Sequence, residues 1–410
     1  MTKDNDFINE LNASLFIYSQ PENKTDIFIS ATSYNDIRNY IKLDDVLQQL
    51  ASKKLDYGKK KTIFRNYLHT KNIFLWYYFN RVTSPTLPFL SKSLSELLPY
   101  SGNCYSPYVN AYLRWSDTIS HLNLDLVFTS NNLSKSDNAI KNEDVMLESL
   151  ISTLQDETTV EEENKASKAF NRTKRNLNRY LSDLLSYKAN LLVLRLDLAF
   201  SKEYLEQSAA SLQQQLLSLD THADYQQFGN ESLSIRDYER TQMSNRFLDS
   251  QLQEIKEYRK KFFRIIKRKY HLEGFVWKLE YGGEKSYHYH CLIFLNGDKH
   301  QEDITIAREM GELWKALTID QSTNTYKGLY WNCNANKSSY KYLAIGKLNA
   351  RNIQMIDNLR KYVLTYIAKT DYYFNLTSTT DRSLGMGNDK VKVKPGRPRK
   401  VLQPASDACS

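Results

Sequence analysis

The sequence predicts an α+β fold in which an antiparallel sheet carries helices on one face, preceded by a mainly helical N-terminal region. Three observations lead to this class. Short segments rich in Leu, Val, Phe and Tyr have the length and composition of strands, and two of them flank a Gly-Gly turn typical of a hairpin. Longer segments with the periodicity of amphipathic helices separate other strands. Strands that are joined by hairpins and interrupted by helices are characteristic of α+β domains.

The predicted elements follow one another from residue 166 onward. A helix is expected first, over residues 169–185, and the succession after it is β-α-β-β-α-β-β-α. Its members are strand 191–200, helix 244–270, strands 274–281 and 287–295, helix 303–316, strands 328–333 and 340–345, and helix 351–369. Residues 203–240 are rich in Gln and Ser, and we expect them to form an insertion.

On this pattern the chain divides into three parts. Residues 1–165 form a mainly helical region without a catalytic motif, and its last part, 129–165, has the composition of a linker or a loose helical connection. Residues 166–380 hold the sheet and its motifs. Residues 381–410 contain Gly, Lys and Pro without apolar periodicity, so we expect this tail to be disordered.

The composition restricts the partners and the compartment. A net charge of +9 and a pI of about 9.0 favour a polyanion, meaning nucleic acid or an anionic membrane surface. Four cysteines at long, irregular spacings argue against a disulfide framework or a zinc knuckle and suit a reducing, cytoplasmic compartment. The N-terminus lacks a signal-peptide pattern, and no apolar run approaches the roughly 20 residues that span a bilayer. We therefore expect no membrane partner.

Two histidines and a carboxylate form a candidate metal site. Residues two apart in a strand share a face of the sheet, so His288 and His290 lie on one face. Glu280 precedes them across the hairpin and can be a cross-strand neighbour of His288. Asp197 lies on the polar side of the first strand, where it could support the site. Such ligands with open positions suit Mg²⁺ or Mn²⁺, which would polarise a phosphate; the alternative is incidental histidines on a half-exposed strand.

The last predicted helix carries a polar stripe. Tyr362, Tyr366 and Lys369 are spaced at i, i+4 and i+7, which places them on one helical face. A tyrosine can be a covalent nucleophile, and a lysine nearby can lower the pKa of a phenol or stabilise charge on a phosphate. Three interpretations stay open: both tyrosines act in turn, Tyr366 acts alone, or the stripe only packs.

These motifs resemble those of the HUH superfamily of rolling-circle replication initiators. The run His-Tyr-His-Cys-Leu-Ile-Phe at 288–294 resembles the histidine–hydrophobe–histidine motif, and Tyr-x-x-x-Tyr-x-x-Lys at 362–369 resembles the two-tyrosine motif. The order of the motifs after strand 194–198 also agrees. The closest resemblance is to replication proteins of filamentous phages (inoviruses) and related prophage proteins, over about residues 166–380.

The resemblance implies roles for individual residues and an HUH endonuclease fold of the ferredoxin/RRM-like kind. It assigns metal binding to His288 and His290 with Glu280 as a third ligand, nucleophilic attack to Tyr362 and Tyr366, and assistance to Lys369. Asp197 lies in the strand of the first motif, as a supporting residue of the site. The implied cofactor is Mg²⁺ or Mn²⁺.

The implied function is initiation of replication by metal-dependent nicking and rejoining of single-stranded DNA at a rolling-circle origin. A covalent 5′-phosphotyrosyl intermediate would hold the cut strand. Single-stranded and origin DNA are the expected partners, and the host replication helicase is an open candidate. Two alternatives remain: a non-catalytic DNA-binding prophage regulator, and a relaxase or transposase with the same chemistry.

Two basic segments are candidate DNA contacts. The helix before the hairpin carries Arg259, Lys260, Lys261, Arg264, Lys267 and Arg268. Such a helix could follow phosphates, although a solvated surface is the alternative. In the tail, Gly-Arg-Pro-Arg resembles the core of an AT-hook, which would place Arg397 and Arg399 in a narrow A·T minor groove.

Overall fold

The computed structural model describes residues 44–64, 103–121, 137–223, 231–282, 286–376 and 382–387. Its N-terminal part contains helical residues 44–51, α3 (Tyr57–Phe64), β1 (Asn103–Tyr105), α6 (Pro107–His121) and α7 (Asp137–Gln155). Then follow α8 (Glu157–Tyr187), β2 (Asn190–Phe200), α9 (Lys202–Ala223), α10 (Glu231–Tyr270), β3 (Gly274–Gly282), β4 (Ser286–Asn296), α11 (Asp303–Leu317), β5 (Ile319–Asp320), β6 (Thr325–Tyr326) and β7 (Gly328–Asn332). The last elements are the 3-10 turn η4 (Lys337–Ser339), β8 (Gly346–Asn349), α12 (Ile353–Asn358), the π-helical turn η5 (Leu359–Leu364), α13 (Thr365–Tyr373), β9 (Phe374–Leu376) and β10 (Leu384–Met386).

The main sheet is antiparallel and confirms the predicted α+β class. Its strands are ordered β10-β3-β4-β2-β7. Strand β8 lies on the same edge of β2 as β7, but β8 pairs with residues 190–193 of β2 and β7 pairs with residues 196–200. Apart from α9 and the small β5–β6 hairpin, the elements β2, α10, β3, β4, α11 and β7 follow the β-α-β-β-α-β order of ferredoxin-like folds. Among the described helices, none is both long and apolar enough to cross a membrane.

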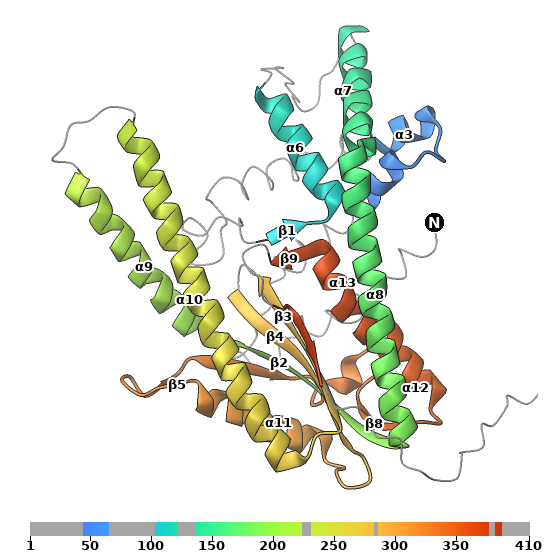
Figure 1. Cartoon of the computed structure of the whole chain (residues 1–410), viewed down its shortest axis with the longest axis vertical. Helices are drawn as coiled ribbons and strands as arrows, with labels where there is room; N and C mark the ends of the chain where they lie inside the picture. The colour runs from blue at the N-terminus through green and yellow to red at the C-terminus, as the bar shows by residue number, and fades with distance from the viewer. Residues whose placement is uncertain are drawn as a thin grey trace, which may run out of the picture.

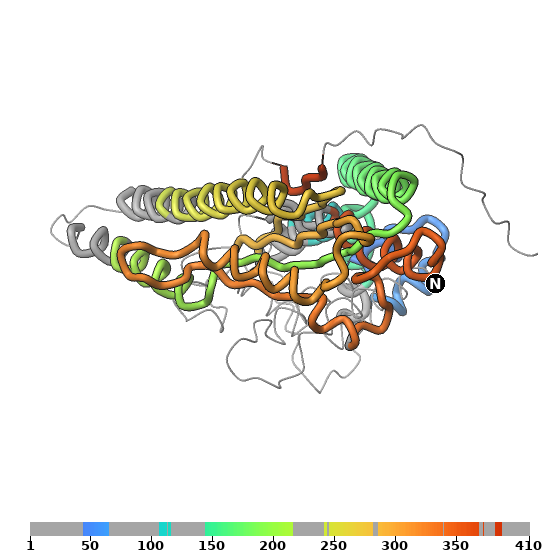
Figure 2. Tube along the Cα trace, turned by 90° about the horizontal axis from the view of Figure 1, so that it is seen from below, coloured from blue at the N-terminus to red at the C-terminus, as the bar shows by residue number. Residues whose placement is uncertain are grey.

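Helices cover both faces of this sheet, where the sequence predicted only one (Figure 1). Helices α9, α10 and α11 pack on one face, with α9 lying along α10 (Figures 1 and 2). Helices α8, α12 and α13 pack on the other face. The reason is that Leu191 and Val193 of β2, and Leu292 and Phe294 of β4, make the second face apolar at one end of the strands. The polar residues of the same face are confined to the other end.

The edge of β2 explains why the predicted strand 340–345 does not form. Between the segments of β2 that pair with β8 and β7, the side chain of Asn334 takes the place of a strand. Its Oδ1 accepts a hydrogen bond from Arg195 N at 2.8 Å, and its Nδ2 donates to Val193 O at 3.0 Å. Because these backbone groups are already satisfied, the chain from η4 to β8 is a loop.

Other local predictions are corrected in the same way. Residues 203–240, expected as an insertion, contribute to the helices α9 and α10, and residues 137–165 are helical in α7 and α8. Helix α8 crosses residue 165 without a break, and the three-part division of the chain remains a prediction. Residues 384–386 of the tail form β10, which pairs with β3 and is therefore ordered. The tail beyond 387 lies outside the described residues.

The N-terminal part has its own core and is attached to the end of α13. Leu47, Leu147 and Leu150 are fully buried in that core. Strand β1 pairs with β9, directly after α13. Gln48 Nε2, in the N-terminal helix 44–51, donates to the Tyr372 hydroxyl of α13 at 3.2 Å. The N-terminal part thus contacts the C-terminal end of α13, the helix that carries Tyr366.

Candidate metal centre and tyrosine site

The β3–β4 hairpin places the three predicted ligands together. Glu280 lies directly opposite His288, which confirms the predicted cross-strand pair. Strand β2 lies on the other side of β4 and places Asp197 opposite His290. All four side chains project from the sheet face that α13 covers, at the polar end of the strands. The site therefore follows from the register of three adjacent strands.

The ligand atoms converge on one oxygen. Glu280 Oε2 lies 3.2 Å from His290 Nε2 and 3.8 Å from His288 Nε2. One ligand atom from each residue can be chosen so that all lie within 4.8 Å of one another, as around a single ion. A search of the described residues for three or more His, Cys, Asp or Glu side chains with ligand atoms this close together finds this one group.

Both imidazoles are held so that Nε2 is the available nitrogen. His290 Nδ1 is 2.6 Å from Asp197 Oδ1, and His288 Nδ1 is 3.1 Å from the backbone oxygen of Ser286. A carboxylate and a carbonyl oxygen only accept, so each Nδ1 carries a hydrogen and donates it. Nε2, on the side of Glu280, is then the nitrogen whose lone pair a metal can use once it carries no proton. Fixing the tautomer from behind is typical of metal-binding histidines.

The residues present fit a divalent cation. Glu280 Oε1 is buried and has no hydrogen-bond partner, although a buried carboxylate oxygen normally has one. Its side chain is 12% exposed, so little solvent reaches it. A cation beside Glu280 would satisfy this oxygen. Imidazole and carboxylate donors are compatible with Mn²⁺ and Mg²⁺, and they leave the identity of the ion open.

The charges of the site act on one another strongly. Burial raises the pKa of Glu280, but the neighbouring His290, His288 and Lys278 outweigh it and lower this pKa to about 2. Burial likewise lowers the pKa of His290, but Asp197 and Glu280 outweigh it and raise this pKa to about 9. Without a metal, His290 is therefore an imidazolium at neutral pH, and its positive charge occupies the place of a cation.

Two basic residues of the site were not singled out from the sequence. Lys278 is 1% exposed and lies opposite His290 on β3. Arg195 is 5% exposed, and its Nε is 4.0 Å from Asp197 Oδ1. A signal was present, because each lies two residues before a predicted site residue on the same strand face. Buried cations on a polar face are a strong indication of an anionic ligand or a charged site.

Tyr366 reaches the metal centre from α13. Its hydroxyl donates to Glu280 Oε2 at 3.3 Å, and its ring centroid is 5.7 Å from that of His290. The Arg195 guanidinium lies 6.0 Å from the Tyr366 ring centroid. Burial, and then the Glu280 charge, raise the pKa of Tyr366 well above its usual range, whereas Arg195 acts in the opposite direction. The predicted tyrosine and the predicted ligands are thus in contact.

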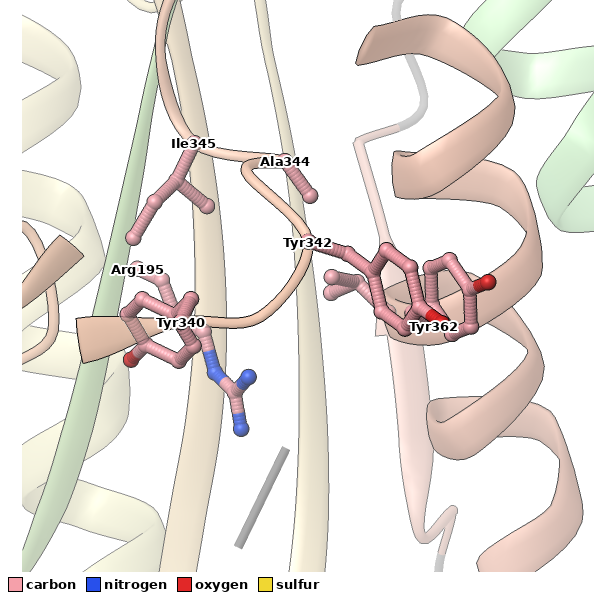
Figure 3. Close-up of a pocket in the computed structure, with 7 residues that line it drawn as sticks. Arg195, Tyr340, Tyr342, Ala344, Ile345 and Tyr362 are labelled. Carbon is pink, nitrogen blue, oxygen red and sulfur yellow. The ribbon is translucent and has the colours of Figure 1, made fainter. Parts of the chain in front are cut away.

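Tyr362 does not occupy an equivalent position. It belongs to the π-helical turn η5, and Thr365 N donates to Arg360 O, five residues earlier. The wider turn changes the angular spacing that an α-helix would give residues 362 and 366. The Tyr362 ring instead stacks on Tyr342 in a pocket (Figure 3). Lys369 lies on α13, but its side chain is outside the described residues.

A comparison with known protein families finds a match, and it covers the region that contains the metal centre and the tyrosines. A family model for the YagK/YfjJ C-terminal domain matches residues 151–387. The chain belongs to this family. The family is one of prophage-associated proteins, in agreement with the prophage part of the predicted resemblance. No curated protein and no solved structure matches the chain. The HUH and inovirus resemblance therefore stays a prediction.

The YagK/YfjJ domain match runs from the last residues of α7 to β10, and so it includes every residue of the metal centre and both tyrosines. The predicted basic residues of α10 lie within it too, but α10 packs on the sheet face opposite the metal centre. Arg259 stacks on Trp277 at 3.8 Å, and Lys267 lies 4.4 Å from the Phe275 ring centroid. Lys260 pairs with Glu257, whereas the remaining predicted positions, Lys261, Arg264 and Arg268, are exposed. Arg397 and Arg399 lie outside the described residues.

Asp197 gives a first testable prediction for this YagK/YfjJ domain. Asp197→Asn keeps the shape of the side chain but weakens the acceptor that fixes His290. We expect the affinity for Mn²⁺ to fall about 10–100-fold, the usual effect of losing such a supporting partner. Isothermal titration with Mn²⁺ measures it, and Asp298→Asn, in the exposed turn after β4, is the matched control. Unchanged Mn²⁺ affinity in Asp197→Asn would contradict the supporting role.

The pKa of His290 predicts that metal affinity depends on pH. Below about pH 9 the metal-free protein holds a proton on His290, and a cation must displace it to reach Nε2. We therefore expect Mn²⁺ affinity to rise by up to about tenfold per pH unit between pH 6 and 8, with one proton released per ion bound. Titrations in buffers of different ionisation enthalpy measure the proton. Affinity that does not change with pH would show that His290 is not a ligand.

Proposed function

We propose that this chain nicks and rejoins single-stranded DNA in a metal-dependent reaction, as an initiator of rolling-circle replication, and that Tyr366 is its nucleophile. One observation carries the proposal: Glu280 Oε2 is approached both by the Nε2 atoms of two oriented histidines and by the hydroxyl of Tyr366. The Tyr366 phenol is hydrogen-bonded to a candidate metal ligand, and the cations Arg195 and Lys278 are buried on the same sheet face. A nucleophile beside a metal site and positive charge suits attack on a phosphodiester.

The proposed roles of the side chains follow from their positions. His288, His290 and Glu280 would hold the divalent ion, which supplies neutralisation of charge on the scissile phosphate. The Tyr366 oxygen forms a bond to phosphorus, the bond from phosphorus to the 3′ oxygen breaks, and that oxygen leaves with the proton lost by the phenol. The 5′ phosphate stays on Tyr366 until a 3′ hydroxyl reverses the step. Arg195, near the Tyr366 ring, favours the anionic form of the phenol.

The partners of this activity are single-stranded and origin DNA, and its place is the cytoplasm. A supercoiled plasmid that carries the DNA flanking the coding sequence of the protein is the substrate for the test. We expect Mn²⁺-dependent conversion to open circles, with protein attached to the 5′ end of the nick and no conversion in EDTA. Binding of the plasmid without nicking under any divalent ion would contradict the enzyme and support the DNA-binding regulator instead.

A further inference from the structure

A pocket lies beside the metal centre, between the sheet and η5 (Figure 3). Arg195 and Tyr340 line it on the sheet side, and Tyr342 and Tyr362 line it on the helix side. The proposed reaction at Tyr366 uses neither Tyr342 nor Tyr362. These two aromatic side chains therefore require another explanation.

The two tyrosines form a flat stack. The ring centroids of Tyr342 and Tyr362 are 4.0 Å apart, and the ring planes differ by 3°. Both side chains are partly exposed, and neither belongs to the buried core clusters of the sheet. Lys341 and Lys361 are exposed, each with its Nζ 5.3 Å from the centroid of the tyrosine next to it in the chain. A flat aromatic surface flanked by positive charge suits an unpaired base and its phosphates.

Arg195 links this pocket to the metal centre. Its side chain is 6% exposed, yet it lines the pocket, while its Nε lies 4.0 Å from Asp197 Oδ1. The same guanidinium lies over the ring of Tyr366. A phosphate that contacts Arg195 from the pocket would therefore be next to the tyrosine and to the ligands around Glu280.

We infer that this pocket binds one unpaired nucleotide of the DNA strand that is nicked. Its base stacks on the Tyr342–Tyr362 pair, and the adjoining phosphate contacts Arg195. Tyr362 is then a base-binding residue and not a second nucleophile. The inference rests on the proposed function in one respect, namely that the bound nucleotide belongs to the strand that is cleaved. Stacking of the base on the two tyrosines requires no cleavage.

The test measures binding of short single-stranded DNA in EDTA, so that no nicking occurs. An abasic site is moved through the oligonucleotide one position at a time. We expect one position at which the abasic site weakens binding to the wild-type protein about 10-fold, the size of one lost base–aromatic stack. Tyr342→Ala should weaken binding of the intact oligonucleotide by a similar factor and should make the abasic site harmless.

A pair of conservative variants separates stacking from hydroxyl chemistry. Tyr362→Phe should restore the affinity that Tyr362→Ala loses, because a phenyl ring stacks as a phenol does. Tyr326→Ala, which removes an exposed ring from the distant β5–β6 hairpin, is the control for loss of any surface tyrosine. Thermal unfolding curves check that each variant is folded.

Two results would overturn the inference. One is that no position of the abasic site affects binding to the wild-type protein. The other is that Tyr362→Phe binds as weakly as Tyr362→Ala. Neither depends on catalysis: a wild-type protein that fails to nick but shows the abasic-site effect contradicts the proposed function and leaves the pocket intact.

Discussion

Tyr366→Phe should abolish covalent protein–DNA adducts and lower the nicking rate at least about 1,000-fold, as removal of a nucleophile does in other enzymes. The phenol oxygen is the atom that forms the new bond to phosphorus, and in this structure it donates a hydrogen bond to Glu280. Phe preserves the ring that packs beside His290 and in the core around α13. The fold and Mn²⁺ binding should therefore persist, so the loss is chemical.

The measurement is the transfer of a 3′-labelled DNA strand to the protein, followed by mass spectrometry of the modified peptide. Tyr362→Phe should still form adducts, and Tyr326→Phe controls for loss of a remote hydroxyl. Adducts in each single variant, with none in the double variant, would establish alternation between Tyr362 and Tyr366. Adducts located only on Tyr362 would contradict the assignment of Tyr366.

The hairpin part of the site could be predicted because it depends on local pattern. A strand period of two and a short turn fix which residues of β3 and β4 share a face and which oppose each other. Glu280 and His288 are close in sequence, so their register is correct. Asp197 was expected only as support, because the pairing of β2 with β4 joins residues 93 positions apart, and no local pattern determines that register.

The tyrosine helix was predicted less completely, because its geometry depends on packing. The i, i+4 spacing of Tyr362 and Tyr366 implies a shared face only in a regular α-helix. The π-helical turn η5 interrupts that regularity, and its own sequence, Leu359–Leu364, contains no Pro or Gly that would indicate an irregular turn. The Tyr342 ring that meets Tyr362 lies in a loop whose course is fixed by Asn334 against β2, a tertiary contact without a sequence signature.

The helices on the second face illustrate the same limit. The alternation of Leu194, Leu196 and Leu198 with Arg195 and Asp197 indicates one buried and one polar face, which predicts helices on one side only. Residues 191–193 of the same strand are all apolar and buried, so that end of the sheet is covered on both sides. The metal centre lies at the other, polar end of this second face, where α13 covers buried charged residues instead of apolar ones.

Replacing both histidines should remove the metal centre itself. In His288→Ala combined with His290→Ala, Glu280 is the only remaining ligand of the group, and one carboxylate holds Mn²⁺ weakly. We expect Mn²⁺ affinity to fall by more than the roughly 10–100-fold that loss of a supporting residue costs, and nicking to be undetectable. Isothermal titration and plasmid nicking measure the two effects, with His300→Ala as a control for loss of a histidine outside the site.

The stability of this variant needs its own control. Without His290, the buried carboxylates of Asp197 and Glu280 lose their shared cationic partner, which can destabilise a fold by about 3–5 kcal/mol. His290→Gln combined with His288→Ala restores an N–H donor toward Asp197 without restoring an imidazole nitrogen for the metal. This variant should unfold at a higher temperature than the double alanine variant and should still fail to bind Mn²⁺. Wild-type Mn²⁺ affinity in either variant, with the fold intact, would mean that the ion binds elsewhere and that the two histidines have another role.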